Sequence, residues 1–121
     1  LMDPIDEQLG ESRTIAVVGL SPEPDRASHR VASYLQGQGY RVIPVNPMIE
    51  EVLGEKSYPD LMSIPVPVDL VDIFRRPEHL PGIVNQAIEI GAKYVWMQDG
   101  LVDEKAAAMA RSAGIGVVMD T

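Results

Sequence analysis

The sequence predicts an α/β protein built on a doubly wound, parallel sheet of five strands. Short runs rich in β-branched residues alternate along the chain with segments of helical periodicity. Most of the runs are continuously apolar, as expected for strands that are covered on both faces. The chain of 121 residues suits one domain. We expect that domain to span residues 13–121, with a polar segment or helix over residues 1–12.

Each expected strand is a compact run bounded by turn residues. The first run ends directly at Gly19, and the others end at asparagine, arginine or glutamine residues, or near the end of the chain. The five expected strands are residues 13–18, 41–45, 68–74, 93–97 and 115–119. Right-handed crossovers leave few ways to connect them, and we expect a Rossmann-like sheet with the order 3-2-1-4-5.

Three helices are expected to connect the strands. Ser28 is the expected N-cap of a helix that runs to about Gln38, and Asp103 is the expected N-cap of an alanine-rich helix ending at Gly114. The middle helix, residues 77–91, has proline at its start and glycine at its end. Shorter helical turns are expected in the proline-rich region between the second and third strands, at residues 48–53 and 59–63.

Charge and composition exclude several classes of function. Ten basic and eighteen acidic residues give a net charge of −8, which argues against nucleic-acid binding. An anionic ligand would need a local basic cluster. The chain has no cysteine, so disulfides, thiol catalysis and cysteine zinc sites are excluded. No apolar run approaches the roughly 20 residues that span a bilayer. We therefore expect a cytoplasmic protein with no membrane association and no metal site.

The loop after the first strand has the features of an anion site. Gly19 and Leu20 lead to Ser21, whose hydroxyl is a donor, and the glycine allows backbone N–H groups to approach a ligand. Arg26 and Arg30 supply local positive charge near the expected cap. The alternative is a plain strand-to-helix turn with exposed basic residues.

The same loop does not match two common nucleotide motifs. Ser21 and Pro24 stand where the dinucleotide fingerprint needs glycines, and no P-loop lysine motif is present. The second strand ends at Asn46 and Pro47, whereas an NAD site has a carboxylate there for the ribose hydroxyls. A neutral amide tolerates a phosphorylated ribose, so these residues favour a phosphorylated nucleotide over NAD. A simple turn before the proline is the other interpretation.

Two further strand ends carry polar residues toward the same edge. Phe74 is followed by Arg75 and Arg76 at the start of a helix, where cations are mildly disfavoured. An anionic ligand or a subunit contact would explain the pair, and a solvated arginine pair is the alternative. Gln98 follows the fourth strand and has both a hydrogen-bond donor and an acceptor.

Six motifs in order resemble the small stand-alone CoA-binding proteins of bacteria and archaea. They are VVGLSP (residues 17–22), PDRxSxR (24–30), GYRVIPVNP (39–47), LGEKxYPxL (53–61), VDIFRRP (71–77) and GAKxxWxQxG (91–100). That family is itself similar to the N-terminal CoA-binding domain of the succinyl-CoA synthetase alpha subunit. The resemblance covers about residues 13–120.

The resemblance implies coenzyme A as the ligand and assigns residues to it. The phosphates would lie on Gly19, Leu20 and Ser21, with further cofactor-binding residues around them. These are Arg26, Ser28, Arg30, Asn46, Pro47, Phe74, Arg75, Arg76, Gln98 and Gly100. Asn46 and Pro47 would border the adenosine half of the ligand.

No catalytic group of a familiar kind is evident in the sequence. His29 and His79 lack spaced partners, and no nucleophile elbow occurs. The favoured interpretation is a non-catalytic module for CoA or an acyl-CoA, acting as carrier, sensor or partner of an enzyme, and a homodimer is permitted. The alternative is an NAD(P)-linked or CoA-ligase-type enzyme, or a fragment of one.

Overall fold

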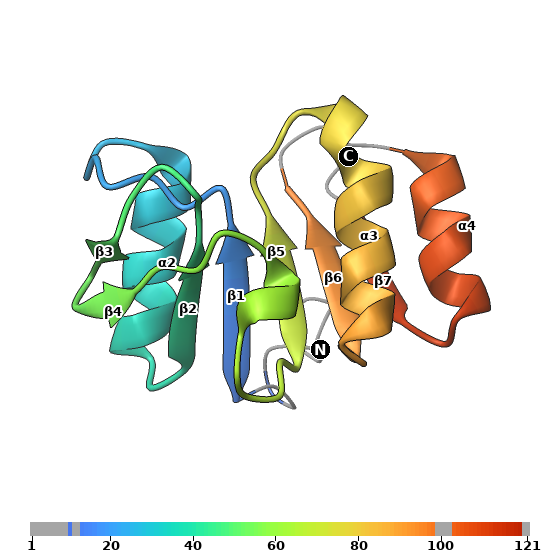
Figure 1. Ribbon diagram of the computed structural model, residues 1–121, viewed down its shortest axis with the longest axis horizontal. Coiled ribbons are helices and arrows are strands. Elements are labelled where there is room, and N and C mark those ends of the chain that lie inside the picture. The colour runs from blue at the N-terminus through green and yellow to red at the C-terminus, as the bar shows by residue number, and fades with distance from the viewer. Residues whose placement is uncertain (1–9, 11–12, 99–102, 120–121) are drawn as a thin grey trace.

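The computed structural model describes residue 10, residues 13–98 and residues 103–119 (Figure 1). The main sheet contains β1 (Thr14–Val18), β2 (Arg41–Val45), β5 (Leu70–Ile73), β6 (Tyr94–Met97) and β7 (Gly116–Met119). A small hairpin is formed by β3 (Glu51–Val52) and β4 (Glu55–Lys56). The helices are α2 (Ala27–Gly37), α3 (Leu80–Glu89) and α4 (Glu104–Ser112), with 3₁₀ turns η1 (Leu61–Ser63) and η2 (Pro77–His79).

The predicted fold class is confirmed, but the predicted strand order was wrong. All five strands of the main sheet are parallel, and their order is β2-β1-β5-β6-β7. In the numbering of the expected strands this is 2-1-3-4-5. The third expected strand, β5, pairs with β1 rather than lying outside β2, with Ile15 opposite Leu70 and Val18 opposite Ile73. The order therefore reverses between β1 and β5.

A proline explains why β2 lies at the edge of the sheet. Pro44 has no N–H to donate, so a strand that contains it is suited to an edge rather than the interior. Its carbonyl oxygen accepts from Tyr58 N at 3.0 Å, on the side of β2 that faces away from β1. Because the N and C=O of one strand residue face the same side, the missing donor also points to this outer edge. Placing β5 outside β2 would have required that donor.

The helices cover opposite faces of the sheet. In β1, the buried side chains of Ile15 and Val17 pack in the core formed with α2, whereas Ala16 and Val18 pack in the core under α3 and α4. This alternation follows the two-residue period of a strand. In Figure 1, α3 lies in front of β6 and β7, and α4 lies beside α3. No helix of the described residues is long and apolar enough to cross a membrane.

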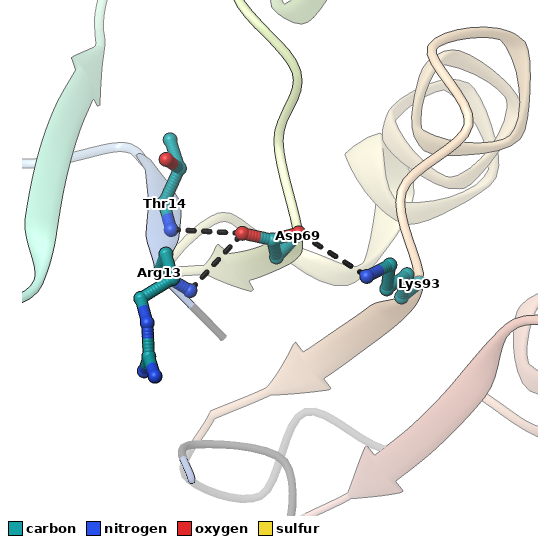
Figure 2. A network of polar contacts seen from close by, with 4 residues as sticks. All are labelled: Arg13, Thr14, Asp69 and Lys93. Atoms are coloured by element: carbon teal, nitrogen blue, oxygen red, sulfur yellow. Dashed lines mark hydrogen bonds and ion pairs between the residues drawn. The ribbon is translucent and has the colours of Figure 1, made fainter. Parts of the chain in front are cut away.

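One carboxylate joins the amino ends of three neighbouring strands (Figure 2). Asp69 Oδ2 accepts hydrogen bonds from the backbone N–H groups of Arg13 and Thr14, each at 3.0 Å, and Oδ1 lies 3.7 Å from Lys93 Nζ. Burial would raise the pKa of Asp69, but the two backbone donors and Lys93 together lower it below its ordinary value. The ionised carboxylate therefore stabilises the edge opposite the carboxyl ends.

Three local expectations had different outcomes. The helical turn expected at residues 48–53 is absent, because β3 and β4 pair there through a turn in which Leu53 (φ 54°) and Gly54 (φ 75°) are both left-handed. The expected turn at residues 59–63 is confirmed in part by η1. Asp103 caps α4 as predicted, since its side chain accepts from Ala106 N.

Ser28 is not the N-cap of α2. The helix begins at Ala27 with Arg26 as its N-cap, and no side chain caps it. The hydroxyl of Ser28 lies inside the first turn and instead accepts a hydrogen bond from Ser21 N at 3.0 Å. A local capping role was thus replaced by a contact to the preceding loop.

Candidate functional site

A groove of about 700 Å³ lies at the carboxyl ends of β1, β2, β5 and β6 and at the first turn of α2. This is the edge where ligands bind in doubly wound sheets, next to the reversal of strand order. Ten of the residues expected in the site line it: Gly19, Ser21, Arg26, Ser28, Asn46, Pro47, Phe74, Arg75, Arg76 and Gln98. Strands whose ends are distant in the sequence thus bring the expected residues together.

Three expected site residues do not line the groove or are not described. Leu20 is fully buried in the core under α2, although its carbonyl oxygen accepts from Asn46 Nδ2. Arg30 directs its guanidinium to the carbonyl oxygen of Asp25. Gly100 lies outside the described residues.

Gly19 brings the ends of β1 and β5 into close contact. Its φ is +87°, and its N–H donates to Val45 O at 2.9 Å. A Cβ atom at this position would lie 2.3 Å from the carbonyl oxygen of Phe74 and 2.9 Å from Cδ of Arg75. Only glycine avoids both the unfavourable φ and this overlap. The glycine therefore sets how closely the loop of residues 19–21 approaches the loop of residues 74–76.

Two serine hydroxyls are oriented as donors by the backbone. Ser28 Oγ accepts from Ser21 N at 3.0 Å, and Ser21 Oγ accepts from Glu23 N at 3.1 Å. A hydroxyl has one proton to donate, and in the described part of the chain neither proton is given to a protein acceptor. Since both serines line the groove, their protons are available to a ligand oxygen.

Asn46 joins two loops at the groove. Its Nδ2 donates to Leu20 O at 3.0 Å, and its Oδ1 accepts from Met48 N at 2.9 Å. Its backbone N–H donates to Tyr58 O at 2.9 Å. The side chain therefore holds the first loop against the end of β2, in addition to lining the groove.

Three arginines give the groove its charge. Arg26, Arg75 and Arg76 line it, and their guanidinium groups have no hydrogen-bond or ion-pair partner in the described part of the chain. Among the described residues that line the groove, none is acidic. The whole protein has a net charge of −8. Because the overall field repels anions, a local basic cluster of this kind is the arrangement that an anionic ligand requires.

A buried polar pair forms the end of the groove at β6. Asp72 is 0% exposed in β5, and its Oδ1 accepts from Gln98 Nε2 at 2.8 Å. Gln98 is buried and lines the groove. Asp72 was not predicted as a site residue, although an acidic residue within an otherwise apolar strand was the available signal in the sequence.

Three residues that line the groove were not predicted from the sequence: Ala27, Met48 and Ile73. Met48 directly follows Pro47 and is 86% exposed, so its position after the second strand was the available signal. Ala27 and Ile73 have no chemical feature that distinguishes them from core residues.

A second hollow, of about 410 Å³, lies at the opposite edge of the sheet, between the ends of α3 and α4. Lys93 is the one charged residue among the described residues that line it, and this lysine is near Asp69. No group of three or more potential metal ligands occurs among the described residues. The groove at the carboxyl ends is therefore the candidate site.

Comparison with curated proteins finds relatives of two sizes. The chain is 48% identical over 116 residues to a Bacillus subtilis protein named "Uncharacterized protein YneT", covering 96% of this chain and 86% of that protein. It is 44% identical over 84 residues to the alpha subunit of an ADP-forming acetate–CoA ligase II from Pyrococcus furiosus. That match covers 69% of this chain and 18% of the ligase subunit.

Among solved structures, the chain likewise matches both a small protein and part of a larger one. A hypothetical protein from Pyrococcus horikoshii OT3 superposes with a TM-score of 0.92 at 43% identity, covering 96% of this chain and 82% of that one. A dinucleotide-forming acetyl-coenzyme A synthetase 1 from Ca. Korarchaeum cryptofilum gives a TM-score of 0.82 at 28% identity, covering 93% of this chain and 27% of the synthetase. Residues 13–121 match the family described as "CoA binding domain". The resemblance seen in the sequence is thus confirmed, and the chain belongs to the CoA-binding domain family.

Proposed function

We propose that this protein binds coenzyme A, free or acylated, in the groove at the carboxyl ends of its parallel strands. One observation carries the proposal: in the part of the chain that the structure describes, three arginines without ion-pair partners and no carboxylate line a groove, although the protein has a net charge of −8. Coenzyme A has a diphosphate and a 3′-phosphate, so its nucleotide half matches such a cluster. Membership of the CoA-binding domain family supports the same ligand.

The proposed arrangement follows the order of the strands. The hydroxyls of Ser21 and Ser28 and the first turn of α2 would hold the diphosphate at the centre of the groove, where the helix dipole favours an anion. The adenosine half would lie toward Pro47 at β2, the outermost strand on one side. The remaining end of the groove, toward β6, would then receive the pantetheine arm.

The proposed role is binding rather than catalysis, as a carrier, a sensor or a partner of an enzyme, in the cytoplasm. Relatives named as acetate–CoA ligases favour a second candidate, the CoA-binding part of such an enzyme. The chain spans 18% of those ligases, and most of their length lies outside the match. The second role requires the rest of the ligase, whereas a carrier or sensor acts without it, alone or as a homodimer, and a partner module acts with a separate enzyme subunit.

Calorimetric titration of the purified protein with CoA, dephospho-CoA, NAD and NADP tests the ligand. We expect micromolar binding of CoA that weakens when the 3′-phosphate is absent, because fewer charges then meet the arginines. Binding of NAD without a CoA signal would overturn the proposal.

Charge reversal supplies the matched control for this titration. Arg26→Glu should weaken CoA binding without unfolding the protein, since Arg26 is exposed at the groove. Arg111→Glu makes the same change in net charge in the last turn of α4, away from the groove. Equal loss of affinity in both variants would mean that net charge alone, rather than the groove, governs binding.

A further inference from the structure

Asp72 is a buried carboxylate beside the groove that has no contact role in the proposed site. It is 0% exposed in the middle of the sheet, with Val17 of β1 and Trp96 of β6 as its register neighbours. Its Oδ1 accepts a hydrogen bond from Gln98 Nε2 at 2.8 Å. A hydrogen bond in this buried setting is stronger than one in water, because the surroundings screen it weakly.

This hydrogen bond decides which end of the Gln98 carboxamide meets a ligand. The amide nitrogen is held by Asp72 Oδ1, which accepts one of its two protons. Gln98 Oε1 accepts no hydrogen bond in the described part of the chain, and it is not among the side-chain atoms sealed from solvent. Since Gln98 lines the groove, its carbonyl oxygen is the group left to face it.

An acceptor at this end contrasts with the rest of the groove. The guanidinium groups of Arg26, Arg75 and Arg76 can only donate. Asn46 Oδ1 also lies at the groove, but it already accepts from Met48 N. The groove therefore has donors at its centre and an unused acceptor at the β6 end.

We propose that Asp72 is a positioning residue, which holds Gln98 so that its carbonyl oxygen selects a ligand with an N–H donor at the β6 end. This inference rests on the proposed function, under which the pantetheine arm of coenzyme A reaches that end. Its secondary amides are N–H donors, whereas the phosphates at the centre of the groove are acceptors only. Without the carboxylate, the amide is free to turn its nitrogen toward the ligand.

Comparing CoA with adenosine 3′,5′-bisphosphate separates the contribution of the pantetheine arm to binding from that of the nucleotide. Adenosine 3′,5′-bisphosphate retains the nucleotide half of coenzyme A and lacks the pantetheine arm. In calorimetric titrations, Asp72→Leu, which keeps the side-chain shape but removes the acceptor, should weaken CoA binding about tenfold. Binding of the bisphosphate should change by less than about twofold in the same variant. Asp72→Asn retains an acceptor oxygen on the same skeleton and should recover most of the loss.

A double-mutant cycle distinguishes positioning from a structural role. Gln98→Met keeps the length of the side chain without its amide, and should lower CoA affinity as much as Asp72→Leu does. Combining the two substitutions should cost no more than Gln98→Met alone, since the residue that Asp72 orients is then absent. Additive losses, or equal losses for both ligands with Asp72→Leu, would overturn the inference.

A measurement on the wild-type protein covers the case in which Asp72→Leu does not fold. The Nε2 proton of Gln98 that donates to Asp72 should exchange slowly with solvent in ¹⁵N-edited spectra, because its acceptor is buried. Fast exchange would overturn the inference. If the wild-type protein binds neither CoA nor the bisphosphate, the proposed function itself fails, which is distinguishable from failure of the role of Asp72.

Discussion

Replacing Gly19 with alanine tests whether the contact between the β1 and β5 loops creates the groove. The new Cβ atom would sit at a φ of +87° and 2.3 Å from the carbonyl oxygen of Phe74. The left-handed conformation costs alanine about 1–2 kcal/mol. Relief of the overlap needs a backbone shift of the kind that costs about 1–3 kcal/mol. We expect Gly19→Ala to destabilise the protein by about 2–5 kcal/mol, and to abolish CoA binding because the loops move apart.

Gly114 provides the matched control. Its φ is +83°, nearly that of Gly19, but a Cβ atom there would meet nothing within 4 Å. Gly114→Ala should therefore cost only the conformational share of about 1–2 kcal/mol and leave CoA binding intact.

Thermal unfolding followed by circular dichroism, with calorimetric titration of CoA, measures both effects. At about 4 °C per kcal/mol for a domain of this size, the midpoint should fall by about 8–20 °C for Gly19→Ala and about 4–8 °C for Gly114→Ala. Equal unfolding midpoints for the two variants, with unchanged CoA affinity in Gly19→Ala, would refute the role of the contact between the loops.

Three further outcomes are expected. Asp69→Asn should lower the free energy of unfolding by about 1–3 kcal/mol near neutral pH, as expected for hydrogen bonds to a charged group. Because folding lowers the pKa of Asp69, the stability difference from wild type should shrink as the pH falls through and below about 4. Urea unfolding at several pH values measures this difference. Ser28→Ala should cost about 1–2 kcal/mol, since it leaves Ser21 N without its acceptor, and should weaken CoA binding, whereas Ser33→Ala on the exposed side of α2 should change neither. Arg75→Gln should weaken CoA binding about tenfold, with a smaller effect at high salt, and an effect independent of salt would contradict a phosphate contact.

Local sequence patterns predicted most of the secondary structure. Apolar runs and the caps and breaks between them placed all five strands of the main sheet and the three helices within a few residues. The β3–β4 hairpin was missed because its turn is made by Leu53 and Gly54, without the asparagine or aspartate that usually marks such a turn. Ser28 was misassigned because its hydroxyl finds a partner in another loop, which no local capping rule includes.

The sequence by itself determined the fold class and the family, and it predicted an anion site in the loop after β1, because these depend on local periodicity, ordered motifs and residue chemistry. Tertiary structure decided which strand ends meet. Only the order with β5 next to β1 places Arg75 beside Gly19, and only the pairing of β5 with β6 brings Asp72 to Gln98. Strand order depends on long-range hydrogen bonding, which a local pattern does not specify. Pro44, whose missing donor suits an edge strand, was the one residue in the sequence that pointed to it.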